Sequence, residues 1–380
     1  MMQYSLLKGG AYLKIDTRLL KKIDFGLIIV VLLICIIGVV AVGSATYSLG
    51  SERYIKTQII SILLGVAAII IILFIDYNTF ARIYIPIYVI CNAMLLAVFI
   101  FGQGSESWGA QRWIRIGSFG FQPSDFAKLG IIICLAKVLD DNKNNLHKPK
   151  VLLKVLLFAG FPMVLILAQP DLGTTLIFAA FIFGMLFVAG LKYKHILIAM
   201  VVGIISAPLA WFGVLHPYQR NRVLIFLNPE QDPLGGGYHT LQSRVAVGAG
   251  MIFGKGLFNG TSNQFGFLPE KHTDFIFSVV AEELGFIGVS VLIILYFIML
   301  YKCIKIARDA KDDFGAYLVS GITFMIAFHI FLNIAMTIGL APVTGKPLPF
   351  VSYGGTFMLT NMIALGLVLN VNMRRDKINF

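Results

Sequence analysis

Charged side chains are scarce in this sequence. Only 13% of its 380 residues are Asp, Glu, Lys or Arg, whereas 58% are apolar. Soluble domains usually contain about 25% charged residues and about 45–50% apolar residues. The shortage of charge therefore excludes a disordered chain, a fibrous protein and an ordinary cytosolic enzyme.

Cysteine is also rare, with four residues that all lie in or beside apolar runs: Cys35, Cys91, Cys134 and Cys303. Their spacing fits neither a zinc site nor a disulfide framework. We expect them to act as small buried hydrophobic residues.

Long apolar runs are what the sequence has instead. A membrane-spanning helix needs about 20 mostly apolar residues. Ten segments qualify: 23–46, 57–75, 83–102, 125–139, 151–168, 172–190, 195–213, 275–301, 317–338 and 356–372. The first is too long for a signal peptide and lacks a cleavage-like end. The fourth is short and begins with polar residues, so we expect it to be partly buried in the bundle. The sequence predicts an all-α integral membrane protein of ten transmembrane helices, with a long extracytoplasmic loop between helices 7 and 8.

The net charge of +12 is explained by topology. If the N-terminus is inside, twenty of the 31 Lys and Arg residues fall in cytoplasmic segments, as the positive-inside rule requires. Both termini are then cytoplasmic, and no nucleic acid is needed as a partner. Residues 1–380 form a single polytopic domain with a cytoplasmic tail at 1–22 and three extracytoplasmic functional loops at 103–124, 214–274 and 339–355.

The second of these loops has about 60 residues, and loops of that length are usually functional or disordered. Its many apolar side chains predict packing rather than disorder: Phe226, Leu227, Phe253, Leu257, Phe258, Phe265, Phe267 and Leu268. We therefore expect any chemistry to face outward.

Two aspartates stand at expected helix starts. Asp274 precedes the eighth apolar run and is flanked by Lys271 and His272. It could be an N-cap, or a carboxylate that acts as a general base or holds a divalent cation. Asp171 interrupts two apolar runs, and it could cap a helix or join Asp274 around a cation or substrate.

Other charged residues leave similar alternatives. Arg220 and Arg222 could bind phosphate, or form salt bridges with Glu230 or Asp232. Asp125 and Lys128 are three residues apart and share one helix face. They form either a structural ion pair or part of a functional cavity, in which Lys128 could reach a phosphate.

Two further features concern the outward ends of later helices. The adjacent Glu282 and Glu283 cannot share one helix face, so we expect at least one of them to pair with a basic residue. The segment 342–355 is rich in Pro and Gly, and Lys346 is its only charge. We expect it to be a shaped re-entrant turn or a wall of the site.

In this order, the motifs resemble the SEDS family (shape, elongation, division and sporulation) of bacterial cell-wall polymerases over nearly the whole chain. They are Trp108–Gly117, Gln122–Asp125, Gln169–Gly173, Tyr218–Arg222, Asp232–Gly235, Gly237–Ser243, Phe267–Phe277 and Thr344–Gly355. The block Tyr238–Gln242 is more similar to the elongation branch, the RodA-like proteins. One departure is that the family usually carries Glu where Asp125 stands.

The resemblance implies an inverting peptidoglycan glycosyltransferase that polymerises lipid II, which carries a polyprenyl pyrophosphate, at the outer leaflet. The family's essential carboxylate corresponds to Asp274, and Arg112, Lys128 and Asp125 match positions where substitution harms function. Lipid II and lipid-linked glycan are the implied ligands. A divalent cation, Mg²⁺ or Mn²⁺, is the implied cofactor. The implied partners are a class B penicillin-binding protein transpeptidase and other elongation-complex membrane proteins.

From the chemistry of the reaction we expect particular roles. Asp274 would be catalytic, and the substrate-binding residues would be Arg112, Lys128, Arg220, Arg222, Lys271 and His272. Asp125, Asp171 and Glu283 would support them, and Asp274 or Asp171 could ligate the metal. Two other functions remain open: a lipid II flippase or other lipid-linked precursor transporter, and a non-enzymatic scaffold that activates a partner.

Overall fold

The fold is described from a computed structural model. It describes residues 22–375 apart from 51, 104–111, 117–118, 193, 196, 198–200, 202–204, 206–207, 209–210, 214–216 and 234.

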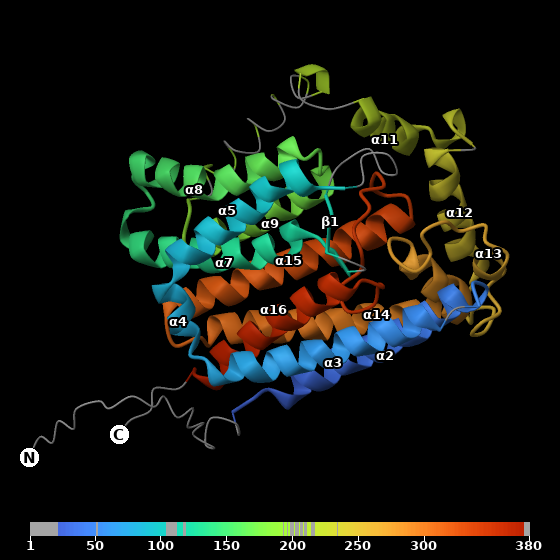
Figure 1. The fold of residues 1–380 in the computed structure, drawn as a ribbon, viewed down its shortest axis with the longest axis horizontal. Helices are drawn as coiled ribbons and strands as arrows, with labels where there is room; N and C mark the ends of the chain where they lie inside the picture. The colour runs from blue at the N-terminus through green and yellow to red at the C-terminus, as the bar shows by residue number, and fades with distance from the viewer. Residues whose placement is uncertain are drawn as a thin grey trace, which may run out of the picture.

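Long helices run side by side along the molecule (Figure 1). In the described part of the chain they are α2 (Phe25–Tyr47), α3 (Arg53–Phe74), α5 (Tyr84–Phe101), α7 (Pro123–Asn142), α8 (Pro149–Ala168), α9 (Leu172–Val188), α14 (Ile276–Arg308), α15 (Asp313–Thr337) and α16 (Gly355–Met373). All of these except α7 and α9 are long and apolar enough to cross a membrane. The nine correspond in order to nine of the ten expected spans, and the chain is an all-α, multi-pass integral membrane protein. The remaining expected span, 195–213, lies largely outside the described residues.

Local sequence explains where several helices begin. Pro123 and Pro149 stand in the first turns of α7 and α8, where a missing N–H costs nothing. Four helices start after an aspartate whose carboxylate accepts a first-turn backbone N–H: Asp24, Asp76, Asp171 and Asp312. The expected capping role of Asp171 is confirmed.

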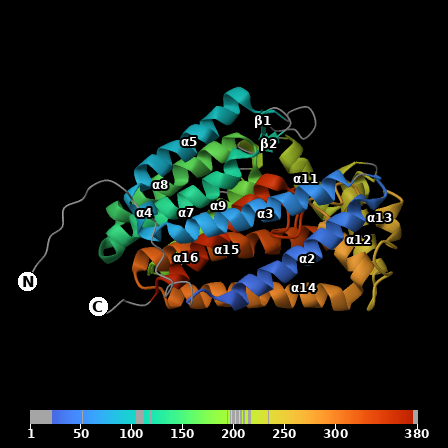
Figure 2. The same cartoon turned by 60° about the horizontal axis from the view of Figure 1, so that its bottom comes forward.

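The two ends of the bundle differ (Figures 1 and 2). The start of α2 and the end of α16 lie at one end, with the short helices α4 (Tyr77–Arg82) and η1 (Lys143–Asn145). We call this the terminal end. The opposite loop end carries the hairpin β1 (Ile114–Ile116) and β2 (Phe119–Phe121), α11 (Pro217–Leu227), η2 (Pro229–Gln231), α12 (Gly236–Ala249), α13 (Thr261–Gln264) and the α15–α16 loop, residues 338–354.

The helices α15 and α16 form the centre of the bundle. Most of the central apolar window of α16 is buried, 89%, compared with 28% of that of α3, which packs against it on the outside. The apolar residues that α3 leaves exposed are those expected to face lipid. Because α16 is buried this deeply, it holds the end of the α15–α16 loop in place, and that loop contributes residues to the candidate active site.

The helix α14 is broken at Gly285, which adopts φ +64° and ψ −166°. The segment before α13 fills this break with its own backbone. Phe286 N donates to the carbonyl of Met251 at 2.8 Å, and Gly256 N donates to the carbonyl of Glu283 at 3.0 Å. The long loop is therefore joined to the membrane helix by backbone hydrogen bonds that the helix itself gives up.

The expectation that the apolar residues of this loop pack inside it is wrong for most of them. Leu268 is buried, but Leu227, Phe253 and Phe265 are each more than 70% exposed. The loop does not depend on an apolar core of its own, because polar contacts to α14 hold it in place. Glu282 accepts from Lys255 Nζ at 2.9 Å, and Glu283 accepts from Asn263 Nδ2 at 3.0 Å. The expected pairing of one of these glutamates with a basic residue is confirmed for Glu282, which pairs with Lys255.

Candidate active site

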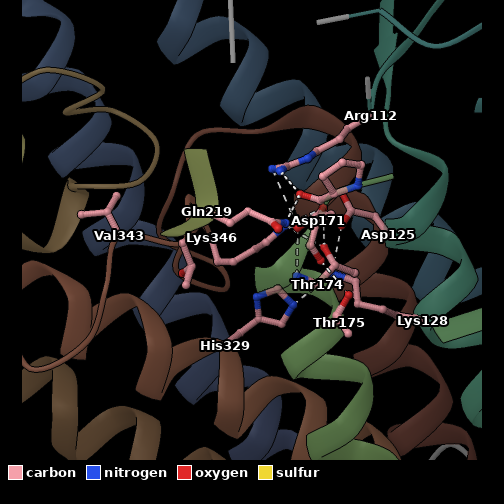
Figure 3. Close-up of polar contacts among 12 residues, drawn as sticks. Arg112, Asp125, Lys128, Asp171, Thr174, Thr175, Gln219, His329, Val343 and Lys346 are labelled. Atoms are coloured by element: carbon pink, nitrogen blue, oxygen red, sulfur yellow. Dashed lines mark hydrogen bonds and ion pairs between the residues drawn. The ribbon is translucent and has the colours of Figure 1, made fainter. Parts of the chain in front are cut away.

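A buried ion pair joins the start of α9 to the α15–α16 loop (Figure 3). Lys346 Nζ lies 2.9 Å from Asp171 Oδ1 and donates to Thr174 Oγ1 at 2.6 Å. Asp171 also accepts from Thr174 N at 3.0 Å. Lys346 is 4% exposed and Asp171 is 2% exposed. Both carboxylate oxygens are thus engaged within the protein.

A second cation, Arg112, reaches the same position from the hairpin side. Its NH1 lies 3.8 Å from Asp171 Oδ1, and its NH2 donates to the backbone carbonyl of Pro170 at 2.7 Å. Tyr218 and Gln219 of α11 also donate to that carbonyl. Arg112 Nε is buried and has no hydrogen-bond partner among the residues that the structure describes. Two cations therefore face one carboxylate, and the cluster carries an excess of positive charge.

A third cation lies among the helices. Lys128 Nζ of α7 is 2.9 Å from Asp125 Oδ1 and 2.9 Å from His329 Nε2 of α15. All three side chains are buried, and the ring of Phe357 lies beside Lys128 and His329. The ion pair expected between Asp125 and Lys128 is confirmed. Charge placed this deep is costly unless it is paired or serves a function.

Asp274 differs from these acids because its carboxylate has no hydrogen bond or ion pair with any residue that the structure describes. It is partly buried, in the segment just before α14. The N-cap of α14 is Phe275, and no side chain caps the helix, so the expected capping role of Asp274 is wrong. The helix starts one residue later than that role requires, and the carboxylate is left available.

The backbone around Asp274 is firmly held by the α15–α16 loop. Tyr353 N donates to the carbonyl of His272 at 2.9 Å, and Ser352 Oγ donates to the carbonyl of Thr273 at 2.7 Å. Asn333 of α15 donates to the carbonyl of Asp274 at 2.8 Å. The loop that carries Lys346 therefore also positions the free carboxylate.

The electrostatic surroundings separate the two aspartates. Burial alone would raise the pKa of Asp171, but Lys346, Arg112 and the N–H of Thr174 outweigh burial and hold that pKa well below its usual range. Burial, reinforced by the negative charge of Glu270, raises the pKa of Asp274 to about 6, against the opposing effect of nearby cations. Asp171 is a fixed anion, whereas Asp274 can take up a proton near neutral pH.

The cations acting on Asp274 are Lys346, Arg222 and Arg112. Arg222 of α11 donates to the carbonyl of Val343 in the α15–α16 loop at 3.2 Å. The structure thus brings together Asp274, Asp171, Arg112, Arg222 and Lys346. Lys128 and His329 lie near Lys346, and Asp125 is paired with Lys128. We call this set the polar site.

Some predicted site residues lie elsewhere. Lys271 is buried and donates to Ser48 Oγ and to the carbonyl of Asn263, and Glu283 accepts from the same asparagine. These residues anchor the long loop. The ring of His272 packs against Tyr54 and Tyr353, and Arg220 donates to the carbonyl of Phe212 at 3.0 Å.

Two residues of the polar site, Lys346 and His329, and the neighbouring Asn333 were not among the predicted site residues. Lys346 gave a signal, since it is the only charge in a Pro- and Gly-rich loop. His329 and Asn333 lie within an otherwise apolar span, where polar residues usually have a function. Spacing alone could not say which residues they contact.

The described residues contain no group of three or more His, Cys, Asp or Glu side chains that could hold a metal ion by themselves. The fold and the site define a class: a multi-pass membrane protein in which a free carboxylate with a raised pKa stands beside a buried excess of Arg and Lys. Such a site can accept a proton next to a group that stabilises negative charge.

Comparison with known proteins gives the family. A model of the FtsW, RodA and SpoVE proteins, described as "Cell cycle protein", matches residues 25–377. The chain is 41% identical to peptidoglycan glycosyltransferase MrdB of Escherichia coli K12, over 77% of this chain and 78% of that protein. It is 37% identical to stage V sporulation protein E of Bacillus subtilis, over 92% and 96% of the two chains.

Comparison with solved structures indicates the same family. A chain from a peptidoglycan synthase complex that coordinates polymerization and crosslinking has a TM-score of 0.78 and 32% identity, over 93% of this chain and 98% of that one. The rod shape determining protein RodA of Thermus thermophilus has a TM-score of 0.69 and 27% identity, with the same coverage. The chain belongs to the FtsW/RodA/SpoVE family, which is the SEDS family.

Proposed function

We propose that this protein is a peptidoglycan glycosyltransferase that polymerises lipid II into glycan strands for cell elongation and shape. Relatives named peptidoglycan glycosyltransferase, one of them 41% identical, support this activity. The observation that carries the assignment within this chain is the Asp274 carboxylate. It is free of hydrogen bonds and ion pairs among the described residues, and it has a raised pKa beside three cations.

The reaction needs a base and a means of stabilising a leaving group. A sugar hydroxyl of the acceptor attacks C1 of the donor sugar, and its proton passes to Asp274. The bond from C1 to the pyrophosphate oxygen breaks, and its electron pair stays on the lipid pyrophosphate. One in-line displacement inverts the α-linked donor to a β-linked product.

The cations of the polar site suit the anionic leaving group. Arg112, Arg222 and Lys128 would contact the pyrophosphates of the lipid substrates, because guanidinium and ammonium groups stabilise phosphate charge. Lys346 is already bound to Asp171 and would add to the positive potential. A pyrophosphate would also offer an acceptor to the unpartnered Nε of Arg112.

A divalent cation, Mg²⁺ or Mn²⁺, is compatible with one of the two aspartates. Mg²⁺ is commonly held by one or two carboxylates together with substrate phosphates and water. Asp274 has a carboxylate available for this mode, whereas both oxygens of Asp171 are engaged by Lys346 and Thr174. When bound, such an ion would offset charge on the leaving pyrophosphate.

The distribution of charge supports an orientation with the loop end outside and both termini in the cytoplasm. Basic residues concentrate at the terminal end of the bundle, among them Arg82, Lys143, Lys302, Lys305, Arg308 and Arg374. The positive-inside rule places that end in the cytoplasm. Asp274 would then meet lipid II at the outer face of the cytoplasmic membrane. We also propose a class B penicillin-binding protein transpeptidase as partner, since one structural neighbour belongs to a synthase complex that couples polymerization to crosslinking.

The test is polymerisation of lipid II by the purified protein, followed on a glycan-length gel with and without a metal chelator. We expect polymer from the wild type and from Asp309→Ala, a matched control at an exposed aspartate of the terminal end. Asp274→Ala and Asp274→Asn should both lose activity. Full activity of Asp274→Ala overturns the catalytic assignment. If Asp274→Asn is active and Asp274→Ala is not, the residue has a structural role. Transport of lipid II across vesicles without polymer would overturn the glycosyltransferase assignment in favour of a flippase.

A further inference from the structure

The ammonium group of Lys128 makes two polar contacts, one within its own helix and one to a neighbouring helix. It has three N–H donors and no acceptor. One contact goes to Asp125 on the same helix and another to His329 on α15, each at 2.9 Å. Among the described residues nothing accepts a third hydrogen bond from Lys128. One N–H of a firmly placed cation therefore remains for a ligand.

This contact fixes the protonation pattern of His329. Lys128 is ion-paired with Asp125, so it donates, and His329 Nε2 must accept. The ring proton of the neutral imidazole then lies on Nδ1. That nitrogen is buried and has no hydrogen-bond partner in the described part of the chain, although the carbonyl of Pro347 lies near the ring.

A neutral acceptor has a specific advantage at this position. A second carboxylate in place of His329 would hold Lys128 equally well, but it would cancel the positive charge that an anionic ligand needs. The imidazole accepts the hydrogen bond and adds no negative charge. The charges of Lys128 and Lys346 both act on this ring, so its neutrality also avoids repulsion between three cations.

We propose that His329 is a positioning residue for the glycosyl transfer: through Nε2 it fixes the Lys128 ammonium so that its remaining N–H meets an oxygen of the substrate pyrophosphate. This role rests on the proposed function. It assigns to a histidine within a membrane span a task that acts entirely through Lys128.

Three substitutions of His329 separate this role from simple packing. In His329→Gln, the amide oxygen can take the place of Nε2 as a neutral acceptor. In His329→Asn, the polar group stays near Nδ1 and does not reach Lys128, and in His329→Leu the acceptor is lost. We expect kcat/KM for lipid II to fall about tenfold or more in His329→Leu and His329→Asn, the effect of one lost hydrogen bond to a charged group. The kcat/KM of His329→Gln should remain within about threefold of the wild type.

A double-mutant cycle tests whether His329 acts through Lys128. Lipid II affinity and kcat/KM are measured for Lys128→Met, His329→Leu and the double variant. We expect the double variant to be no worse than Lys128→Met alone. Additive losses of kcat/KM in the double variant would overturn the proposal. Full activity of His329→Leu, or equal losses of kcat/KM in His329→Gln and His329→Leu, would also overturn it. If His329→Leu does not fold, the comparison of His329→Gln with His329→Asn tests the proposal, and equal activity of these two variants overturns it.

The control lies on the same helix. Thr323 of α15 is buried and donates to the carbonyl of Val319 within its own helix at 2.7 Å. Thr323→Val should therefore leave the lipid II affinity and kcat/KM unchanged. Failure of the proposed function would appear separately, as a wild-type protein that makes no polymer from lipid II, whereas failure of this inference leaves polymerisation and its requirement for Asp274 intact.

Discussion

The side-chain amide of Asn333 donates to the backbone carbonyl of Asp274 and to that of Lys346, each at 2.8 Å. Asn333 is fully buried in α15. Its two N–H groups thus join the segment that carries the free carboxylate to the loop that carries the buried ammonium. The central helix of the bundle sets the relative position of base and cation through a single residue.

We predict that Asn333→Ala lowers the rate of polymerisation more than it lowers affinity for lipid II. The substitution removes this donor from the partly buried carbonyl of Asp274 and the buried carbonyl of Lys346, and an unsatisfied buried group costs about 1–3 kcal/mol. We expect a lower Tm in detergent and a fall in kcat of tenfold or more. Asn361→Ala is the matched control, because that buried amide donates only within its own helix, to Phe357. An Asn333→Ala protein that polymerises at the wild-type rate would contradict this role.

The rate of polymerisation should depend on pH through Asp274. Burial and Glu270 raise the pKa of this carboxyl to about 6. The residue acts in its ionised form, so activity should be full above this pH and fall as the pH drops through it. Glu270→Gln removes one cause of the raised pKa and should move the acid limb of the rate profile to lower pH. An acid limb that does not move in Glu270→Gln would show that another group controls it.

The sequence predicts the architecture well because the pattern that encodes it is local. Runs of about 20 apolar residues and N-terminal Pro and Asp residues correctly indicate nine helices of the described chain. The ion pair of Asp125 and Lys128 was predictable for the same reason, since three residues of spacing suffice to place them on one face.

The contacts of the site could not be predicted in the same way, because they join residues far apart in the chain. Lys346 and Asp171 are 175 residues apart, and Lys128 and His329 are 201 apart. Lys271 shows how far sequence neighbours can diverge. Its position beside Asp274 in sequence indicates a substrate contact, but its side chain turns to Ser48 and Asn263. Which side a residue faces in a loop is decided by packing that no local pattern encodes.

We predict that Asp171→Asn destabilises the protein by about 3–5 kcal/mol, the cost of leaving a buried partner charge uncompensated. Lys346 would lose the anion at 2.9 Å, and Arg112 would lose the same carboxylate. Adding Lys346→Met should recover part of this stability, because it removes one uncompensated cation. Thermal unfolding in detergent measures the effect. Equal Tm values for the wild type and Asp171→Asn would show that the pair contributes nothing to folding.

The break in α14 gives the last prediction. Gly285 has a positive φ, and a Cβ placed on it would lie 2.2 Å from the backbone N of Gly254. Gly285→Ala therefore combines a strained backbone with a clash that would push the long loop away from α14. We expect a lower Tm and faster proteolysis within residues 250–268. Gly248→Ala is the control, since Gly248 lies in α12 with nothing within 4 Å of its added Cβ. That variant should be neutral or more stable by about 0.5–1 kcal/mol. If Gly285→Ala keeps the wild-type Tm and protease resistance, the loop is not held through this break, and the side chains of Glu282, Glu283 and Lys271 must anchor it.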